Sequence, residues 1–491
     1  MKMENVNNKE EEKSLIAENT TPIDTSKAVK AVVWYTFGSV LLKGIAFIST
    51  PIFTRLLSKS EYGAFSNITT WASLITIFAT MELAASMMRA RTEFKVDIHR
   101  FMFSLLPFGN LITGLMYIAA CIFMDDVTKW LSIDSIYIHM IFISLLFTPA
   151  TTIIMTHLKY RYKYKLSTLI SIGSPVLNTA VSLILVLSLE NKLLGRSVGY
   201  FIVPTIVGLI CYIYLFVSGK GIKISYWKYA IKISFPLTLH LLSMYILSQS
   251  DRIMITKICG EEQNALYSLA YSCGVVLSFL WSALNSAFSP IICDALDTND
   301  YHYTQKMTLP YLAVYIVPTF MLMLLGPELV YIMGGEPYME AKSVMPPIVV
   351  GSILQYMYTL YVNIEQYEKK TWGVAVGTTI AGLANIVLNA WLIPIFGYIA
   401  AAYTTLFCYI LLFVIHFLLV KRMKRDKFYN TKIVFGFALL AILFSFASQI
   451  LYSFMIVRYI ISAVYIVLIL IAIIKKKNAI IGLFKSNKKH S

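Results

Sequence analysis

The sequence predicts an all-α integral membrane protein with about fourteen transmembrane helices. Apolar residues make up 58% of its 491 residues. Charged residues make up only 14%, against about 25% in a typical soluble domain. The apolar residues are gathered in long runs, and a helix needs roughly 20 of them to cross about 30 Å of hydrocarbon. This composition excludes a soluble enzyme, a nucleic-acid-binding protein and a disordered scaffold.

Fourteen apolar segments follow one another along the chain, separated by short polar loops. Most exceed the length of a helix in a soluble protein. They cover residues 31–54, 64–88, 101–124, 136–157, 166–188, 199–218, 229–256, 266–288, 308–326, 343–363, 373–393, 398–419, 432–454 and 457–474. The first 28 residues are polar and rich in Glu and Lys, so we expect a disordered cytoplasmic tail without a cleavable signal peptide.

The placement of the basic residues predicts the topology. With an even number of spans, both termini lie on one side of the membrane. If that side is cytoplasmic, its loops hold 32 of the 42 Lys and Arg residues, and the opposite loops hold eight. Such a bias at alternating loops is the positive-inside pattern. We therefore attribute the net charge of +16 mainly to topology and expect no nucleic-acid partner.

Two short stretches resemble each other at an offset of 202 residues. Arg55–Ser66 aligns with Lys257–Ser268, and each runs from a basic helix end through a polar loop to a helix start with an aromatic residue and Ser. Parallel repeats of this kind occur in transporters, with the substrate site at their interface near mid-membrane. We expect two six-helix lobes related by a pseudo-twofold axis. The predicted boundaries are 29–218 and 219–420, followed by two C-terminal helices and a basic tail at 421–491.

Four sequence blocks, in order between residues 51 and 402, carry a resemblance to a known family. The first block, Pro51–Gly63, resembles the first-helix signature of the Wzx-type polysaccharide flippases. These belong, with the MATE exporters and the lipid II flippases, to the MOP superfamily. The other matching blocks are Ser250–Ile255 with Ala265–Ser268, Gly326–Tyr338 and Asn385–Ala402.

The resemblance implies a flippase of the bacterial or archaeal cytoplasmic membrane. Its substrate would be an oligosaccharide linked to polyprenyl (undecaprenyl) diphosphate, moved outward by alternating access for capsule, O-antigen or exopolysaccharide assembly. The implied partners are this substrate, membrane lipids and a polysaccharide polymerase or assembly complex. We expect a monomer without a cofactor, and protons, sodium ions and the membrane potential stay open as alternatives for the coupling.

Three alternative functions were weighed. A lipid II flippase has the same architecture and a related substrate, so it is the nearest alternative. A MATE-like small-molecule exporter is less favoured, because two intramembrane cations suit an anionic substrate. A membrane-bound polymerase, ligase or glycosyltransferase needs a sizeable loop outside the membrane. The longest outer loop predicted here, 327–342, has about 16 residues and carries no paired carboxylates or nucleotide-binding motif.

Lys43 and Arg252 are the two basic residues inside apolar segments, where a charge costs roughly 2.5–3.5 kcal/mol on insertion scales. In a water-filled cavity, the Lys43 ammonium would attract the lipid diphosphate or acidic sugars. It could instead pair with Glu82 or extend its ammonium to the membrane surface. Arg252 could bind phosphate through two hydrogen bonds. Its neighbour Asp251 diverges by about 100° on a helix and could hold Arg252, Lys43 or a coupling cation. Alternatively, both residues lock the turn at the outer end of their helix.

Glu82 is the only carboxylate deep in the first half of the chain. It could be a proton or sodium site, or simply the partner of Lys43. Many relatives have a small residue near this position, which makes the local electrostatics differ. Arg89, with Arg91, could form an entrance for a phosphorylated lipid, or could only anchor the topology. We expect His416 to be structural.

Overall fold

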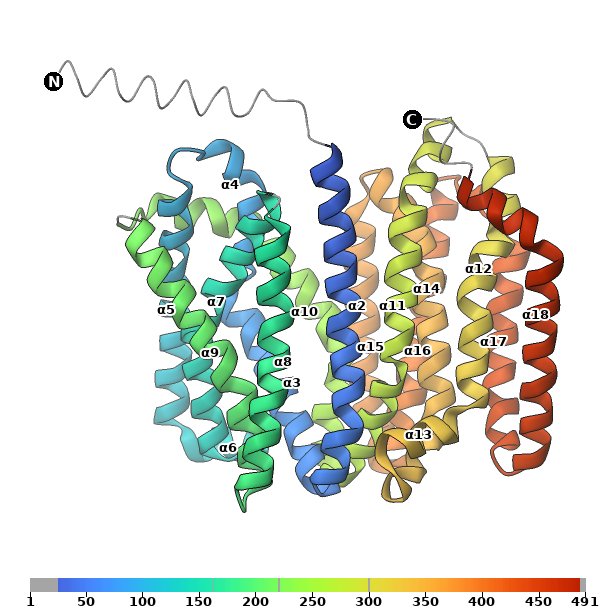
Figure 1. Cartoon of the computed structure of the whole chain (residues 1–491), viewed down its shortest axis with the longest axis horizontal. Helices are drawn as coiled ribbons and strands as arrows, with labels where there is room; N and C mark the ends of the chain where they lie inside the picture. Colours follow the sequence, from blue (N-terminus) through green and yellow to red (C-terminus); the bar gives the residue numbers. More distant parts are fainter. Residues whose placement is uncertain (1–24, 162, 220, 299–300, 486–491) are drawn as a thin grey trace.

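The computed structural model describes residues 25–161, 163–219, 221–298 and 301–485. The predicted disordered tail therefore lies almost entirely outside the described residues. Long helices stand side by side (Figure 1). Helix α2 begins at the top of Figure 1, and α6 and α13 lie at the bottom. We call these the upper and lower ends of the bundle.

The N half comprises the elements from α2 to α9. Six long helices form it, together with short helices at the two ends of the bundle. Its elements are α2 (Thr25–Leu56), α3 (Lys59–Thr80), η1 (Leu83–Ser86), α4 (Met87–Glu93), α5 (Ile98–Ile122), α6 (Met124–Leu131), α7 (Ser135–Tyr160), α8 (Tyr164–Ser188) and α9 (Lys192–Gly219).

The C half comprises the elements from α10 to α16, and two further helices follow it. The C half contains α10 (Ser225–Cys259), α11 (Glu261–Thr298), α12 (Tyr301–Leu324), α13 (Gly326–Gly334), η2 (Glu336–Val344), α14 (Met345–Tyr367), α15 (Thr371–Phe396) and α16 (Tyr398–Arg422). The chain then continues through η3 (Asp426–Phe428), α17 (Thr431–Leu451) and α18 (Met455–Lys485).

The predicted all-α membrane class is confirmed. In the described part of the chain, fourteen helices have at least 21 residues, and one falls on each predicted apolar segment. Ten of these are long and apolar enough to cross a membrane, and α3 with η1 and α4 adds a bent candidate. Helices α2 and α18 contribute shorter apolar stretches, Gly44–Leu56 and Met455–Ile471. The protein is therefore a multi-pass membrane protein.

Two segments differ from the sequence prediction. Residues 64–88 were expected as one helix, but α3 ends at Thr80 and the chain bends by 46° before continuing. The bend is made by Met81 and Glu82, whose φ angles are 43° and 48°, a left-handed conformation that is uncommon outside glycine. The predicted outer loop 327–342 is also not irregular, because α13 and η2 occupy it.

Helix α10 bridges the two halves, crossing diagonally behind α2 (Figure 1). Near its upper end, the Tyr226 hydroxyl donates to the Asp97 carboxylate (3.0 Å), and the Trp227 indole donates to the Ser104 carbonyl on α5 (2.6 Å). Near its lower end, Asp251 bonds to residues of α15 and α16. Side chains on α10 can therefore contact either half.

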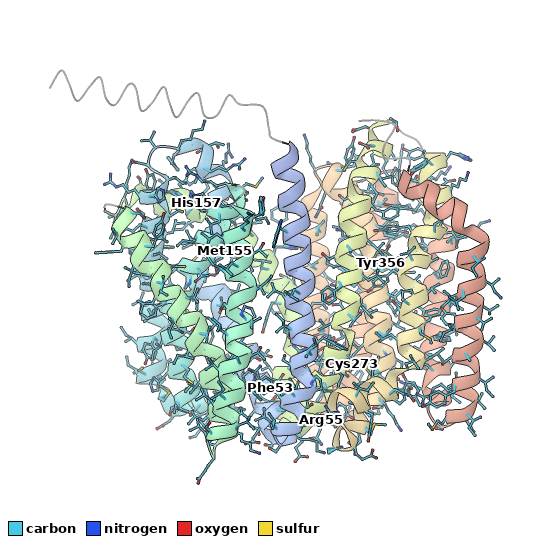
Figure 2. The ribbon with its side chains drawn as sticks, in the orientation of Figure 1. Phe53, Arg55, Met155, His157, Cys273 and Tyr356 are labelled. Atoms are coloured by element: carbon cyan, nitrogen blue, oxygen red, sulfur yellow. The ribbon has the colours of Figure 1, made fainter. Side chains whose placement is uncertain are left out.

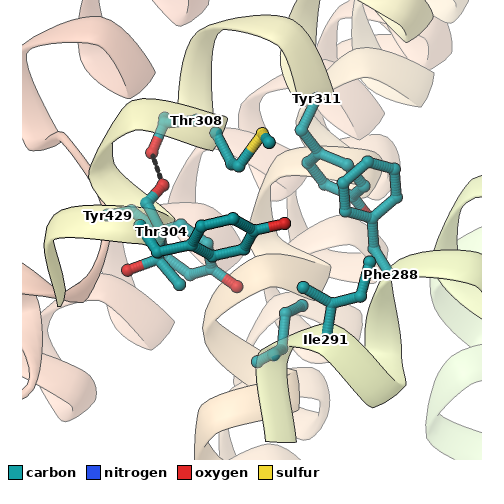
Figure 3. A pocket seen from close by; sticks show the side chains of 9 residues that line it. Phe288, Ile291, Thr304, Thr308, Tyr311 and Tyr429 are labelled. Atoms are coloured by element: carbon teal, nitrogen blue, oxygen red, sulfur yellow. Dashed lines mark hydrogen bonds between the residues drawn. The ribbon is translucent and has the colours of Figure 1, made fainter. Parts of the chain in front are cut away.

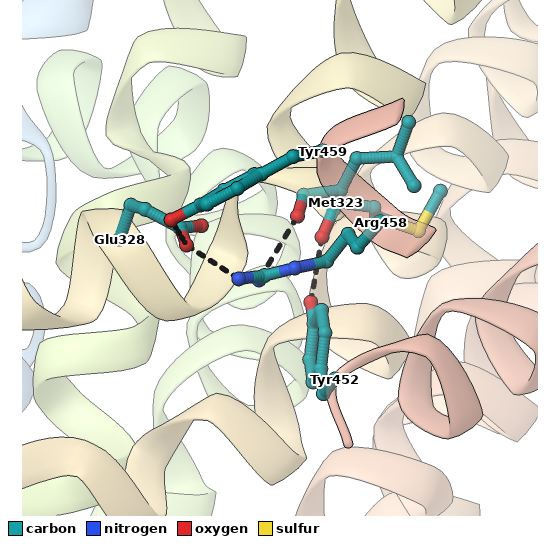
Figure 4. Close-up of polar contacts among 6 residues, drawn as sticks. Met323, Glu328, Tyr452, Arg458 and Tyr459 are labelled. Carbon is teal, nitrogen blue, oxygen red and sulfur yellow. Dashed lines mark hydrogen bonds and ion pairs between the residues drawn. The ribbon is translucent and has the colours of Figure 1, made fainter. Parts of the chain in front are cut away.

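The last two helices are joined to the C half through a buried arginine. Arg458 begins α18, is 3% exposed, and donates to the Leu324 carbonyl (3.2 Å) and to the Glu328 carboxylate on α13 (Figure 4). Tyr459 also donates to Glu328 (2.8 Å), and Tyr452 donates to the Met323 carbonyl (2.7 Å). Burial of the charge is offset by this carboxylate and these backbone acceptors.

Candidate functional site

Residues of the repeated motif meet one another at the lower end of the bundle. The Ser66 and Ser268 hydroxyls lie 2.7 Å apart, and these two residues are separated by the repeat offset of 202. Lys59 pairs with Glu262 (3.7 Å), and Ser60 donates to Glu261. In the repeat, Lys59 corresponds to Glu261 and Ser60 corresponds to Glu262. Exchanging the two repeats therefore turns the Lys59–Glu262 contact into the Ser60–Glu261 contact. Such self-complementary contacts are those of a twofold axis.

Gly63 brings the backbones of α3 and α11 together at this axis. The Asn264 side-chain amide donates to the Gly63 carbonyl (3.0 Å). A Cβ atom at Gly63 would lie 1.8 Å from the Glu261 carbonyl oxygen, so any larger residue would push the two helices apart. We call the contacts among residues 54–66, 261–268 and 332–333 the lower seal.

The end of α2 adds a second layer to the lower seal. Thr54 donates to the Met333 carbonyl, and Arg55 donates to the Ile332 carbonyl (2.9 Å), both at α13. Phe53 and Arg55 lie at the lower end of α2 (Figure 2). The Arg196 guanidinium lies 3.8 Å from the centre of the Phe53 ring and 4.5 Å from that of Phe65. The lower seal therefore joins both halves tightly at this end.

Asp251 lies at the centre of a fully buried polar network in the C half. Its carboxylate accepts hydrogen bonds from Tyr267 on α11, Asn389 on α15 (2.6 Å) and Thr405 on α16 (2.7 Å). Asn385 extends the network, because it donates to Thr405 (3.0 Å) and accepts from Asn389 (3.2 Å). Three neutral donors thus satisfy the carboxylate, and it forms no ion pair with Arg252 among the described residues.

Arg252 contacts α11 one turn away from the Asp251 contact. Its guanidinium lies 5.2 Å from the centre of the Tyr271 ring, a cation–π distance. Its Nε atom is buried and has no hydrogen-bond partner. Within the described part of the chain, no carboxylate pairs with this arginine. Arg252 is therefore an intramembrane cation with unused donor capacity.

Glu82 lies at the break between α3 and η1, beside a cavity of about 110 Å³. The described residues provide no ion-pair or side-chain hydrogen-bond partner for its carboxylate. The side chain of Lys43, which lies on α2, is outside the described part of the structure, so the predicted Lys43–Glu82 pair stays a prediction.

Arg89 is on α4 at the upper end. Its guanidinium pairs with Glu93 on the same helix (2.9 Å), and its side chain is 75% exposed. Arg91 nearby donates to the Tyr160 carbonyl (3.2 Å). The structure brings Asp251 and Arg252 onto the bridging helix and places Arg89 at the upper surface. The roles assigned to these residues remain predictions.

The sequence prediction missed a buried contact between a histidine and a carboxylate in the C half. His416 Nδ1 lies 2.7 Å from Glu365 Oε1, and the two side chains are 0% and 1% exposed. The Tyr358 ring stacks on the imidazole. The structural role expected for His416 has a physical basis here, because a buried carboxylate needs a partner. Glu365 lies 51 residues away from His416, so no local spacing signals the pair.

Cavities occur in both halves. A small C-half pocket of about 20 Å³ is lined mainly by aromatic and apolar side chains, among them Phe288, Tyr311 and Tyr429 (Figure 3). Three larger cavities of about 390, 160 and 110 Å³ lie in the N half. Of the predicted site residues whose side chains the structure describes, Glu82 alone lines one of these cavities.

Comparison with known families identifies the protein class. Residues 28–296, more than half of the chain, match the family described as polysaccharide biosynthesis protein. The chain belongs to this family. The predicted membership of a polysaccharide flippase family is therefore confirmed.

Individual relatives agree with this family membership. A Haemophilus influenzae protein of the Lsg locus is 21% identical over 355 residues, covering 70% of this chain and 86% of the relative. The structure resembles that of the lipid II flippase MurJ in an inward closed conformation, with a TM-score of 0.70, 14% identity, and coverage of 91% and 100%. An inward-facing multidrug resistance MATE transporter of the MOP superfamily gives a TM-score of 0.57 at 13% identity, with coverage of 79% and 95%. This family member therefore has the MOP-superfamily fold.

Proposed function

We propose that the protein is a flippase that moves a polyprenyl-diphosphate-linked oligosaccharide across the cytoplasmic membrane for surface polysaccharide assembly. The observation that carries this proposal is Arg252. It is an intramembrane guanidinium on the bridging helix, without a carboxylate partner among the described residues. A cation of this kind suits an anionic ligand such as a diphosphate, and the family's link to polysaccharide biosynthesis supports a sugar cargo.

The upper end of the bundle faces the cytoplasm in this proposal, because the loops between the helices at that end carry most of the basic residues. The lower seal then closes the route to the outer face, and the chain is poised to receive substrate from the inner face. Transport requires the lower seal to separate while the upper end closes. The two halves, related by the repeat, provide the two bodies that move.

In this scheme, Arg252 holds the diphosphate by charge-assisted hydrogen bonds. Lys43, on the opposite half, adds a second positive charge. Arg89 and Arg91 attract the phosphorylated lipid to the upper surface. The chain acts as a carrier in this scheme, working as a monomer beside the polymerase of the assembly pathway and performing no covalent chemistry.

The Asp251 network is the coupling site in this proposal. Asp251, Asn385, Asn389, Thr404 and Thr405 present carboxylate, amide and hydroxyl oxygens, the ligand types preferred by hard cations. A proton or a sodium ion binding there would replace hydrogen bonds that now join α10 to α15 and α16. Ion binding would therefore change how the bridging helix packs against the C half.

The test is complementation of a strain that lacks the gene. Lys43→Ala and Arg252→Ala should each abolish the surface glycan while the protein remains in the membrane at normal amounts. Lys232→Ala, which removes an exposed cation on α10, is the matched control and should restore the glycan fully. Glycan is measured by immunoblot, and protein by membrane fractionation. Normal glycan in both test variants would overturn the role of these two cations.

The lipid II flippase is the second candidate, because the fold is close to that of MurJ. Depletion of the gene separates the two. A polysaccharide flippase leaves peptidoglycan synthesis intact and surface glycan missing, whereas a lipid II flippase leads to arrest of peptidoglycan synthesis and lysis.

A further inference from the structure

Four hydroxyl-bearing residues follow one another at four-residue intervals along α7. They are Ser144, Thr148, Thr152 and Thr156, and this spacing places them on one face of the helix. They run from the middle of α7 towards its upper end, near Met155 in Figure 2. A polar face on a membrane helix must pack against polar partners or line a cavity, because lipid cannot bond to it.

Each of these residues lines a cavity of the N half. Ser144 and Thr148 line the cavity of about 160 Å³, Thr152 the one of about 110 Å³, and Thr152 with Thr156 the one of about 390 Å³. Neighbouring cavities share lining residues. Thr152 belongs to the second and third, and Thr76 on α3 belongs to the first and second. The cavities therefore follow one another along the hydroxyl face of α7.

The hydroxyls along this row have unused hydrogen-bonding capacity. Thr168 on α8 is only 4% exposed and lines the largest cavity, yet its Oγ1 has no hydrogen-bond partner. Among the described residues, none bonds to the Ser144, Thr148 or Thr152 hydroxyl, whereas the Thr156 hydroxyl donates to the Thr152 carbonyl (2.8 Å) and the Thr76 hydroxyl to the Ala72 carbonyl (2.6 Å). Buried polar atoms are almost always paired, so the unpaired Thr168 hydroxyl at the cavity indicates a polar occupant.

The charges around the cavities narrow the nature of that occupant. Among the described residues that line the three cavities, Lys159 and Glu82 are charged, one basic and one acidic. The described lining therefore offers no cluster of cations for a diphosphate. A hydroxyl both donates and accepts hydrogen bonds, so a row of hydroxyls matches a ligand that is itself rich in hydroxyls. The largest cavity is within the size range of small-ligand pockets, about 300–1,000 Å³.

We propose that this row, with Ser144, Thr148, Thr152 and Thr156 on α7, Thr76 on α3 and Thr168 on α8, binds the sugar part of the substrate. We call it the hydroxyl track. This inference rests on the proposed function and adds a division of labour to it. The N half holds the uncharged sugar rings through hydroxyls, and Arg252 on α10 holds the diphosphate.

The experiment compares binding of two lipids to the purified full-length protein in detergent. One is undecaprenyl diphosphate without sugar, and the other is the lipid-linked oligosaccharide extracted from cells of the source strain that lack the gene. The test variant is Thr148→Val/Thr152→Val/Thr156→Val, which removes three hydroxyls at similar side-chain shape. The control is Thr205→Val on α9, whose hydroxyl bonds to the Phe201 carbonyl and lines none of the three cavities.

The wild type and the control should bind the glycosylated lipid at least tenfold more tightly than the bare lipid. The triple variant should lose this difference while its affinity for undecaprenyl diphosphate is unchanged. Size-exclusion chromatography checks that the variant is folded, and the single variant Thr152→Val, with a smaller loss, replaces it if the triple variant aggregates.

Each outcome has a distinct meaning. Full retention of the tenfold difference in the triple variant, or no difference in the wild type, overturns the hydroxyl track. Equal loss of affinity for both lipids also overturns it, because the track would then contribute to the diphosphate site or to the fold. Failure of the wild type to bind either lipid contradicts the proposed function itself.

Discussion

The two halves of the molecule differ in the polar clusters that their helices carry, although both contain buried polar atoms without partners. In the C half, Asp251 accepts hydrogen bonds from three donors, and Glu365 pairs with His416. In the N half, hydroxyl-bearing residues of α7 line cavities, and the buried Thr168 hydroxyl on α8 has no hydrogen-bond partner. One hydrophobic core runs through the C half and extends to α17, whereas the N half has separate smaller ones.

This difference suggests a physical division between a rigid half and a receptive one. Saturated networks at low dielectric fix the helices that carry them, because each group pays a desolvation cost if its partner moves away. Unpartnered hydroxyls around cavities bear no such constraint and remain available to a ligand. The repeat therefore supplies two similar scaffolds with different interiors.

The largest expected effect comes from breaking the saturated network. Asp251→Ala removes the acceptor for Tyr267, Asn389 and Thr405, and each buried donor left without a partner costs about 1–3 kcal/mol. We expect a strongly lowered unfolding midpoint in detergent, measured by intrinsic fluorescence. Asp251→Asn keeps the side-chain shape and one acceptor oxygen, so its unfolding midpoint should fall less. An unchanged midpoint for Asp251→Ala would refute the saturated network.

A somewhat smaller effect should follow from breaking the buried contact between Glu365 and His416. His416→Leu leaves the Glu365 carboxylate buried without a partner, which typically costs about 3–5 kcal/mol. Thermal unfolding of the purified protein measures the loss. The double variant Glu365→Leu/His416→Leu should recover most of the stability, because no charge remains unpaired. If the double variant lost as much stability as the two single variants together, the contact between Glu365 and His416 would not account for the loss.

The smallest effect is expected in the hydroxyl track. Thr152→Val removes no hydrogen bond donated by its hydroxyl, so stability should change by less than about 0.5 kcal/mol. The matched C-half variant is Thr308→Val, which loses bonds to the Thr304 carbonyl (2.9 Å) and from the Asn430 amide (3.2 Å). The same unfolding measurement should show a larger loss for Thr308→Val. Equal losses of stability in the two variants would contradict the difference between the halves.

Much of the fold could be predicted from the sequence. Long apolar segments indicate the membrane spans, and the alternating charge of the loops indicates their orientation. The repeat offset aligned Ser66 with Ser268 in the sequence, and the structure shows that their hydroxyls meet. The break at Met81–Glu82 could not be predicted, since neither residue favours a left-handed backbone conformation and no glycine or proline marks it. Tertiary packing imposes that bend.

The site was predicted only in part, because its residues contact partners that lie far away along the chain. Asp251 and Arg252 were recognised as intramembrane charges, but the partners of Asp251 on α15 and α16 lie more than 130 residues away. The i, i+4 hydroxyls of α7 are present in the sequence, but no prediction was made from them. Hydroxyls also join packed membrane helices, so only the cavities distinguish the two roles.

Crosslinking across the lower seal tests the central claim, that the two halves separate there during transport. Ser66 and Ser268 hydroxyl oxygens lie 2.7 Å apart, so cysteines at both positions can form a disulfide in the closed seal. The measurement is translocation of the fluorescently labelled lipid-linked oligosaccharide in proteoliposomes containing Ser66→Cys/Ser268→Cys. Each single-cysteine variant, oxidised in the same way, serves as a control. Oxidation should stop translocation by the double variant alone, and a reductant should restore it. Translocation at the wild-type rate with the disulfide fully formed would contradict the account.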